Sequence, residues 1–143
     1  MPHEIRITRR LPATPAEVYD AWTDAQSIAE WMCPGPGMSS KATLDVRVGG
    51  RFHIDMMGPG VSYPHDGEYL RLDRPRLIEF TWISDGTQQQ PTVVTIELKP
   101  AGDDTELTLT HSSFPQQDAA ERHEQGWGSI VDSLAETLMK IRR

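Results

Sequence analysis

The feature that most constrains the fold is a change of hydrophobic period late in the chain. In several segments before residue 112, apolar and polar residues alternate at period two, which is typical of strands with one buried face. From about Asp118 to Arg142 the period is helical. Apolar residues recur there at steps of four, three, four and three, at Trp127, Val131, Leu134, Leu138 and Ile141. A helix of about 37 Å, at 1.5 Å per residue, needs a concave surface to pack on. The sequence therefore predicts an α+β fold in which a curved sheet grips a long C-terminal helix.

The strand pattern predicts about seven strands. We expect them at residues 4–10, 42–48, 51–57, 67–73, 76–83, 92–99 and 105–111. Glycine and proline turns separate several of them, with Gly49-Gly50 interpreted as a tight hairpin turn and Gly58-Pro59-Gly60 as the next turn. Most links are too short for parallel crossovers, so the sheet should be mostly antiparallel.

Two short helices are expected after the first strand. Thr14 is a suitable N-cap, Pro15 fits the first helical position, and Glu17 completes a capping box. A second helical segment should run from Ser27 to Met32 and stop at Pro34-Gly35-Pro36-Gly37. Together with the strands, these helices place all of residues 1–143 in one predicted domain.

Two glycines interrupt the predicted long helix on either side of Trp127. Each of Gly126 and Gly128 costs roughly 1 kcal/mol relative to alanine inside a helix. Two interpretations remain open at this point: an irregular first turn, or a backbone that comes close to another group.

Composition excludes several classes of partner. The net charge of −7 argues against nucleic acid, whose affinity comes from clustered Lys and Arg. No apolar run approaches the roughly 20 residues of a membrane helix, and the first residues lack the pattern of a secretory signal. The single cysteine, Cys33, cannot form an internal disulfide. We therefore expect a cytoplasmic protein without membrane insertion.

Seven segments occur in an order that resembles a known superfamily. They are Pro15 to Thr23, Ala29 to Met32, Val48 to Phe52, Gly67 to Leu70, Phe80 to Trp82, Thr108 to His111, and Gly126-Trp127. The chain resembles the START-like or SRPBCC superfamily, with the helix-grip fold of the birch-pollen allergen. Within it, the chain is similar to bacterial relatives of the C-terminal domain of the activator of heat-shock protein 90 ATPase. The resemblance implies a deep cavity between helix and sheet, but not one activity.

The predicted cavity lining combines the inner face of the sheet with the helix stripe and nearby aromatic residues. The candidate ligand-binding residues are Trp31, Phe52, Ile54, Met56, Tyr69, Phe80, Trp82, His111, Trp127, Val131 and Leu134. An apolar set of this kind describes a ligand pocket or an ordinary packed core, and both stay open. Tyr69 also competes with Leu70 and Leu72 to be the buried parity of its strand, because a shift of one residue reverses the faces.

Polar groups on the inner face bear on catalysis. His111 shares parity with Leu107 and Leu109 and is the ionisable group expected to reach the cavity. His53 and Asp55 have the opposite parity to Phe52 and should face solvent. The histidines and Cys33 lack zinc-motif spacing, and the glycine segments match no nucleotide fingerprint. We therefore expect no metal, no cofactor and no assigned catalytic residue.

Three functional hypotheses follow. The leading one is noncovalent binding of a small hydrophobic or aromatic ligand in the internal cavity. An enzyme of the polyketide cyclase or dehydratase kind, using His111 and Tyr69, is the second, and the sequence favours a binding protein over it. The resemblance alone implies the third, regulation of a heat-shock protein 90 type chaperone ATPase. Whether the chain forms a homodimer or has a chaperone partner stays open.

Overall fold

A seven-stranded antiparallel sheet and a long helix dominate the computed structural model, which describes residues 3–32, 38–114 and 116–142. The strands are β1 (His3–Leu11), β2 (Ser39–Leu44), β3 (Arg51–Gly58), β4 (Val61–Asp73), β5 (Leu77–Trp82), β6 (Thr92–Ala101) and β7 (Asp104–Phe114). The helices are α1 (Pro15–Trp22), α2 (Ala25–Trp31), the 3₁₀ helix η1 (Asp85–Thr87) and α3 (Gln117–Arg142). The order across the sheet is β1-β7-β6-β5-β4-β3-β2. This arrangement confirms the predicted α+β helix-grip class.

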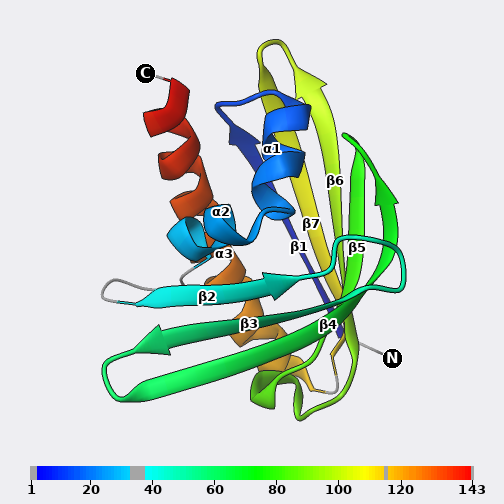
Figure 1. The fold of residues 1–143 in the computed structure, drawn as a ribbon. Coiled ribbons are helices and arrows are strands. Elements are labelled where there is room, and N and C mark those ends of the chain that lie inside the picture. The colour runs from blue at the N-terminus through cyan, green and yellow to red at the C-terminus, as the bar shows by residue number, and fades with distance from the viewer. Residues whose placement is uncertain (1–2, 33–37, 115, 143) are drawn as a thin grey trace.

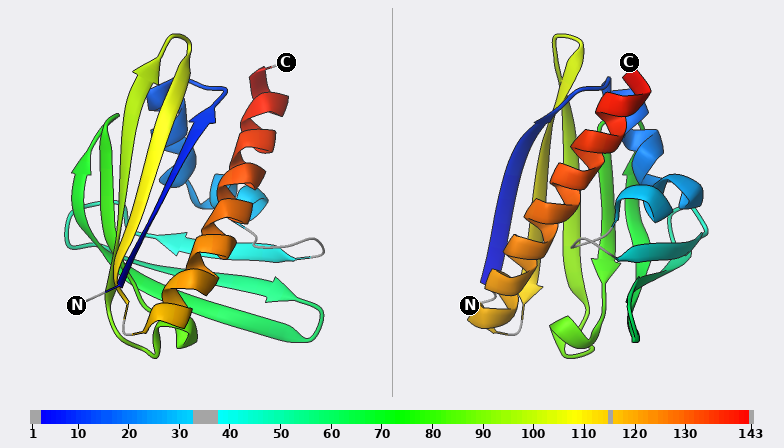
Figure 2. Two further views of the ribbon diagram at one scale, coloured as in Figure 1. Left: turned by 180° about the vertical axis from the view of Figure 1, so that it is seen from behind. Right: turned by 90° about the vertical axis from the view of Figure 1, so that its left-hand side faces the viewer.

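Curvature of the sheet creates the concave face on which α3 packs. β2 and β3 run across the direction of β1, β6 and β7, and α3 lies on the concave side with α1 and α2 beside its C-terminal half (Figures 1 and 2). Part of the bend comes from a register shift in β4, between Tyr69 and Arg71. Tyr69 is buried before the shift, and Leu72 packs against the core after it. The competition between the two parities is therefore resolved by a bulge that turns both residues inward.

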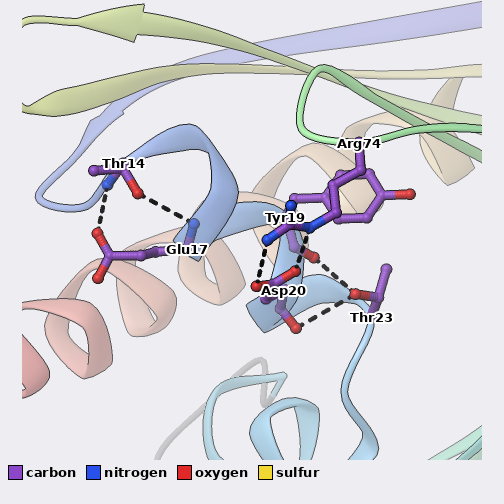
Figure 3. A network of polar contacts seen from close by, with 6 residues as sticks. All are labelled: Thr14, Glu17, Tyr19, Asp20, Thr23 and Arg74. Carbon is purple, nitrogen blue, oxygen red and sulfur yellow. Dashed lines mark hydrogen bonds and ion pairs between the residues drawn. The ribbon is translucent and has the colours of Figure 1, made fainter.

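The first helix is fixed at both ends by side chains. Thr14 Oγ1 accepts a hydrogen bond from the Glu17 backbone, and Glu17 Oε1 accepts one from the Thr14 backbone, which confirms the capping box (Figure 3). Arg74, in the turn after β4, donates from Nε and Nη2 to both carboxylate oxygens of Asp20, each at 2.9 Å. This bidentate pair joins α1 to the β4–β5 turn and lowers the pKa of Asp20.

The second helix also begins at a cap, but earlier than expected. Asp24 Oδ2 accepts a hydrogen bond from the Ser27 backbone, so α2 starts at Ala25 instead of Ser27. The predicted stop at residues 34–37, and Cys33 itself, lie outside the described residues.

The predicted strand at residues 42–48 is wrong in its second half. β2 ends at Leu44, and Val46 and Val48 are exposed. The chain turns there because Arg47 donates to the Asp45 carbonyl and Gly50 donates to the Arg47 carbonyl. A Cβ on Gly50 would lie 2.1 Å from the Asp45 oxygen, so this turn requires glycine.

The helical stripe is confirmed over most of its length. Trp127, Val131, Leu134 and Leu138 are buried, whereas Ile141 is 67% exposed and was wrongly included. Ile141 lies in the last turn of α3, and the left view of Figure 2 shows this end of the helix standing apart from the strands. Among the described residues, no helix has the length and apolar character needed to cross a membrane.

Candidate functional site

One end of the concave face is filled by the two short helices. Trp22, Ile28 and Met32 pack there against the sheet side chains Phe52, Ile54, Tyr69, Phe80 and Trp82, and only about 10 Å³ of space remains among them. Trp31 is completely buried beside Trp22, at a ring separation of 4.6 Å. We call this region the closed end.

The other end holds a pocket of about 410 Å³ that is partly open to solvent. It lies between the β3–β4 hairpin, the end of β5, η1 and the first half of α3. Its walls are mostly apolar. The lining residues are Met56, Tyr63, Pro64, His65, Trp82, Ser84, Asp85, Gly86, Arg122, His123, Gly126, Trp127 and Ile130. We call this region the open end.

Glycine on α3 leaves part of this space unfilled. Gly126 and Gly128 both lie well inside the continuous helix, so the interpretation as an irregular first turn is wrong. A Cβ on Gly126 would meet no atom within 4 Å, and Gly126 lines the pocket. A Cβ on Gly128 would instead approach Arg9 Nη2 at 3.8 Å, away from the pocket. The helix therefore presents bare backbone to the cavity at Gly126.

A buried hydrogen-bond chain fixes the two tryptophans of the pocket wall. Trp127 Nε1 donates to His111 Nδ1 at 2.9 Å, so the neutral ring carries its proton on Nε2 and donates to Thr92 Oγ1 at 2.7 Å. Thr92 in turn donates to the Trp82 carbonyl at 2.6 Å. His111 is fully buried, and burial lowers its pKa well below the usual value. His111 thus supports the wall from behind.

Two other histidines lie at the pocket itself. The His65 ring packs on Trp82 at a centroid distance of 4.7 Å, and its Nδ1 has no hydrogen-bond partner among the described residues. His123 Nδ1 donates to the Ala119 carbonyl at 2.8 Å. Burial lowers the pKa of both rings, and nearby backbone carbonyls only partly offset this effect. Both imidazoles are therefore neutral at neutral pH.

The structure divides the predicted site residues into three groups. Met56, Trp82 and Trp127 line the open end. Phe52, Ile54, Tyr69 and Phe80 border the small space of the closed end. The remaining four are Trp31, His111, Val131 and Leu134. In the part of the chain that the structure describes, they are buried and line neither the pocket nor the small space.

The sequence interpretation did not include His65 or His123. His123 precedes Trp127 by four residues, a spacing that places both on one helix face and could have found it. His65 lies in β4, opposite Ile54 of β3. The predicted strand begins at residue 67, whereas β4 begins at Val61, so the alternation that places His65 extends beyond the predicted bounds.

A separate polar cluster lies on the outer face of the sheet. His53 Nδ1 is 2.6 Å from Asp66 Oδ1, and its Nε2 is 3.0 Å from Asp55 Oδ1. The hydrogen bond with Asp66 is the main cause of a raised His53 pKa. The His53 side chain is 45% exposed, which confirms the expectation that it faces solvent. Within residues 3–32, 38–114 and 116–142, no three His, Cys, Asp or Glu residues are grouped so that they could hold a metal ion.

Solved structures of bacterial proteins share this fold. Protein CV1439 from Chromobacterium violaceum is 28% identical, with a TM-score of 0.86 over 94% of this chain and 96% of that one. Protein NE0264 from Nitrosomonas europaea is 22% identical, with a TM-score of 0.80 over 97% and 96% of the two chains. An AHSA1-like protein from Aeromonas hydrophila is 20% identical, with a TM-score of 0.82 over 97% and 94%.

The sequence also matches a family model. No relative was found among curated proteins. The model described as "Activator of Hsp90 ATPase homolog 1-like protein" matches residues 12–139, which is most of the chain and includes every residue of the pocket wall described above. The chain therefore belongs to the family of activator of Hsp90 ATPase homolog 1-like proteins.

Proposed function

We propose that this protein binds a small hydrophobic or aromatic molecule noncovalently at the open end. The observation that carries the proposal is the pocket of about 410 Å³ with mostly apolar walls. Ligand pockets commonly have volumes of roughly 300–1,000 Å³ and combine apolar walls with a few polar groups. Protein interiors otherwise leave few voids larger than a water molecule, as the closed end illustrates.

The construction of the walls supports binding at this place. The ring centroids of Trp82 and Trp127 are 5.0 Å apart. The buried hydrogen bonds through His111 and Thr92 hold both residues in place. Such fixed aromatic surfaces lower the entropic cost of ligand binding, because few rotamers must be frozen. The bare backbone at Gly126 adds room for a flat ring against the helix.

The arrangement favours binding over the cyclase hypothesis. Both ring nitrogens of His111 are engaged, so the ring could exchange a proton with a ligand only after the buried chain broke. Tyr69 borders the closed end, and burial raises the pKa of its hydroxyl well above the usual value. A role with a chaperone ATPase is suggested by the family description alone.

A matched pair of glycine substitutions tests the proposal. Gly126→Leu adds a side chain at a pocket-lining position where a Cβ meets no atom within 4 Å. Gly128→Leu adds the same side chain beside Arg9, whose long side chain can move. Both changes replace a helical glycine and should gain similar helix propensity. A panel of lipids and aromatic metabolites, with naphthalene as the simplest probe, would be screened by native mass spectrometry and thermal shift.

We expect at least one apolar compound to bind the unmodified protein and Gly128→Leu, and to lose its affinity for Gly126→Leu. Failure of every apolar compound to bind would contradict the proposal. Equal binding to both variants would also contradict it, because the ligand would then lie elsewhere.

A further inference from the structure

The hydrogen-bond state of His123 restricts what kind of ligand the open end accepts. His123 lies in the second turn of α3, and its Nδ1–H is used by the Ala119 carbonyl. In a neutral imidazole this leaves Nε2 as a bare acceptor. Among the described residues, no group donates to Nε2. A ligand group that meets this nitrogen must therefore donate a hydrogen bond.

The position of the ring is closely defined. Phe114 packs on one side at a centroid distance of 4.8 Å, and His111 stands edge-on at 5.1 Å. Gly86 of η1 lies next to the Cε1–Nε2 edge of the ring, where a Cβ would be 3.0 Å from Cε1 and 3.4 Å from Nε2. Any larger residue at that position would crowd the nitrogen. These ring contacts and the hydrogen bond to Ala119 hold the His123 ring in place, and glycine at position 86 puts no side chain beside its Nε2.

Burial, more than the charged groups around the ring, keeps the His123 imidazole neutral, and the charged side chains nearby largely balance one another. Burial is the main cause of the lowered His123 pKa, and the Arg122 cation lowers it further. Arg122 Nη1 is itself 3.5 Å from Asp118 Oδ2, and Asp85 Oδ1 accepts a hydrogen bond from Gln89. The second pocket histidine, His65, is neutral as well. A free carboxylate would thus bring no donor to Nε2. The pocket wall would offer it Arg122, which already pairs with Asp118, together with the repulsive carboxylate of Asp85.

We propose that the ligand is a hydroxylated aromatic molecule, a phenol or aromatic alcohol, whose ring lies against Trp82 and Trp127 and whose hydroxyl donates to His123 Nε2. The inference rests on the proposed function, because it names the ligand class for the same pocket. His65 also lines the pocket, with its ring packed on Trp82 at 4.7 Å, so it contributes to the aromatic surface that would hold the ligand ring. A ligand with an apolar body and one donor satisfies both kinds of surface in the pocket.

The test compares three probes of nearly equal shape: naphthalene, 2-naphthol and 2-naphthoate. Their affinities at neutral pH would be measured by isothermal titration calorimetry. We expect 2-naphthol to bind more tightly than naphthalene by on the order of 3- to 10-fold, the net value of one hydrogen bond, and 2-naphthoate to bind most weakly. In His123→Phe the ratio of 2-naphthol to naphthalene affinity should fall to about one, because an aromatic ring is kept and the acceptor is lost.

The ratio within one variant is unaffected by a general loss of folded protein. The matched control is His53→Phe, on the outer face of the sheet, which should keep the full preference. Should His123→Phe fold poorly, Gly86→Ala provides a second route, because its Cβ crowds the ring and should also reduce the preference.

Three results would overturn the inference. Equal affinities for naphthalene and 2-naphthol would mean that no hydrogen bond forms, while the proposed function would stand. Tightest binding of 2-naphthoate would make Arg122 the anchor and the ligand an acid. An absence of binding by all three probes, together with a negative wider screen, would contradict the proposed function itself.

Discussion

The closed end and the open end share one concave sheet face, yet about 10 Å³ remains free at one and about 410 Å³ at the other. At the closed end, α1 and α2 insert bulky side chains such as Trp22 and Met32. At the open end, the cover consists of η1 and the first half of α3, which presents Gly126. The covering elements, rather than the composition of the sheet face, decide where a pocket remains.

The two ends also differ in their polar groups. His65, His111 and His123 all lie at or directly behind the open end, and burial lowers the pKa of each. The closed end is lined by aromatic and aliphatic side chains. The open end therefore combines poorer packing with groups that respond to pH, and both properties can be measured.

The largest expected difference comes from removing one isoleucine at each end. Ile28, on α2, and Ile130, on α3, are both helical and almost fully buried. Ile28→Ala should reduce the free energy of unfolding by about 4 kcal/mol, because it leaves a cavity in a filled region. Ile130→Ala enlarges a space that solvent already reaches and should cost about 2 kcal/mol. Urea denaturation would measure both, and equal losses would contradict the distinction between the ends.

Replacing His111 should weaken the wall between the ends. His111→Phe keeps a ring but leaves the buried Trp127 Nε1–H without its acceptor, which should cost about 2 kcal/mol of stability. The affinity for an apolar ligand should fall as well, because Trp127 loses its fixed position. His53→Phe serves as the control for adding a phenylalanine. If stability and affinity were unchanged in His111→Phe, the hydrogen-bond chain would have no structural role.

Acidification should act through the open end. Folding lowers the pKa of His111. Above the unfolded value of 6.5 the residue is neutral in both states and does not affect stability. Below 6.5 the unfolded chain binds a proton that folded His111 does not, so the free energy of unfolding decreases as pH falls. The slope can reach about 1.4 kcal/mol per pH unit for this residue. His65 and His123 act in the same direction, whereas the raised pKa of His53 stabilises the fold below 6.5 and loses that effect as pH rises. Urea denaturation across this range should show a shallower acid loss in His111→Phe, and an unchanged slope would exclude this assignment.

The smallest expected effect lies at the edge of the closed end. Thr14→Ala removes the cap of α1 and should reduce the free energy of unfolding by about 1 kcal/mol. Ligand affinity should stay the same, because α1 does not line the open end. A loss of affinity in calorimetry would show that the two ends are coupled through α1.

Much of the fold could be predicted, because many of its helices and strands are specified by residues close together in the sequence. The Thr14 to Glu17 capping box, the alternation of β5 and β6, and the stripe through Trp127 each depend on near neighbours in the sequence. The bulge in β4 was not predicted: an extra residue shifts the alternation by one position, and a shift of this kind cannot be told from an uncertain choice of buried face. Strict alternation puts Tyr69 and Leu72 on opposite faces of the strand, whereas in the structure both side chains turn toward the core.

The site was predicted less completely, because it depends on which element lies opposite each residue. Trp127 and Val131 belong to the same helical stripe, yet Trp127 borders the pocket and Val131 lies in the core. The sequence predicts that His111 reaches the cavity. In the structure Trp127 lines the pocket instead, and its Nε1–H donates to His111 Nδ1. The sequence shows Gly126 only as a residue that disfavours a helix. The structure adds that a Cβ there would meet no atom within 4 Å and that Gly126 lines the pocket.

The most direct test of the central claim uses the tryptophan indole signals as reporters for the two ends. Trp127 lines the open end, and Trp31, whose Nε1 donates to Ser27 Oγ, lies at the closed end. Two-dimensional ¹H–¹⁵N NMR would follow both indole N–H resonances during a titration with naphthalene. The account predicts that the Trp127 resonance shifts and saturates while that of Trp31 stays in place. A shift of Trp31 with Trp127 unmoved would contradict the assignment of the pocket to the open end.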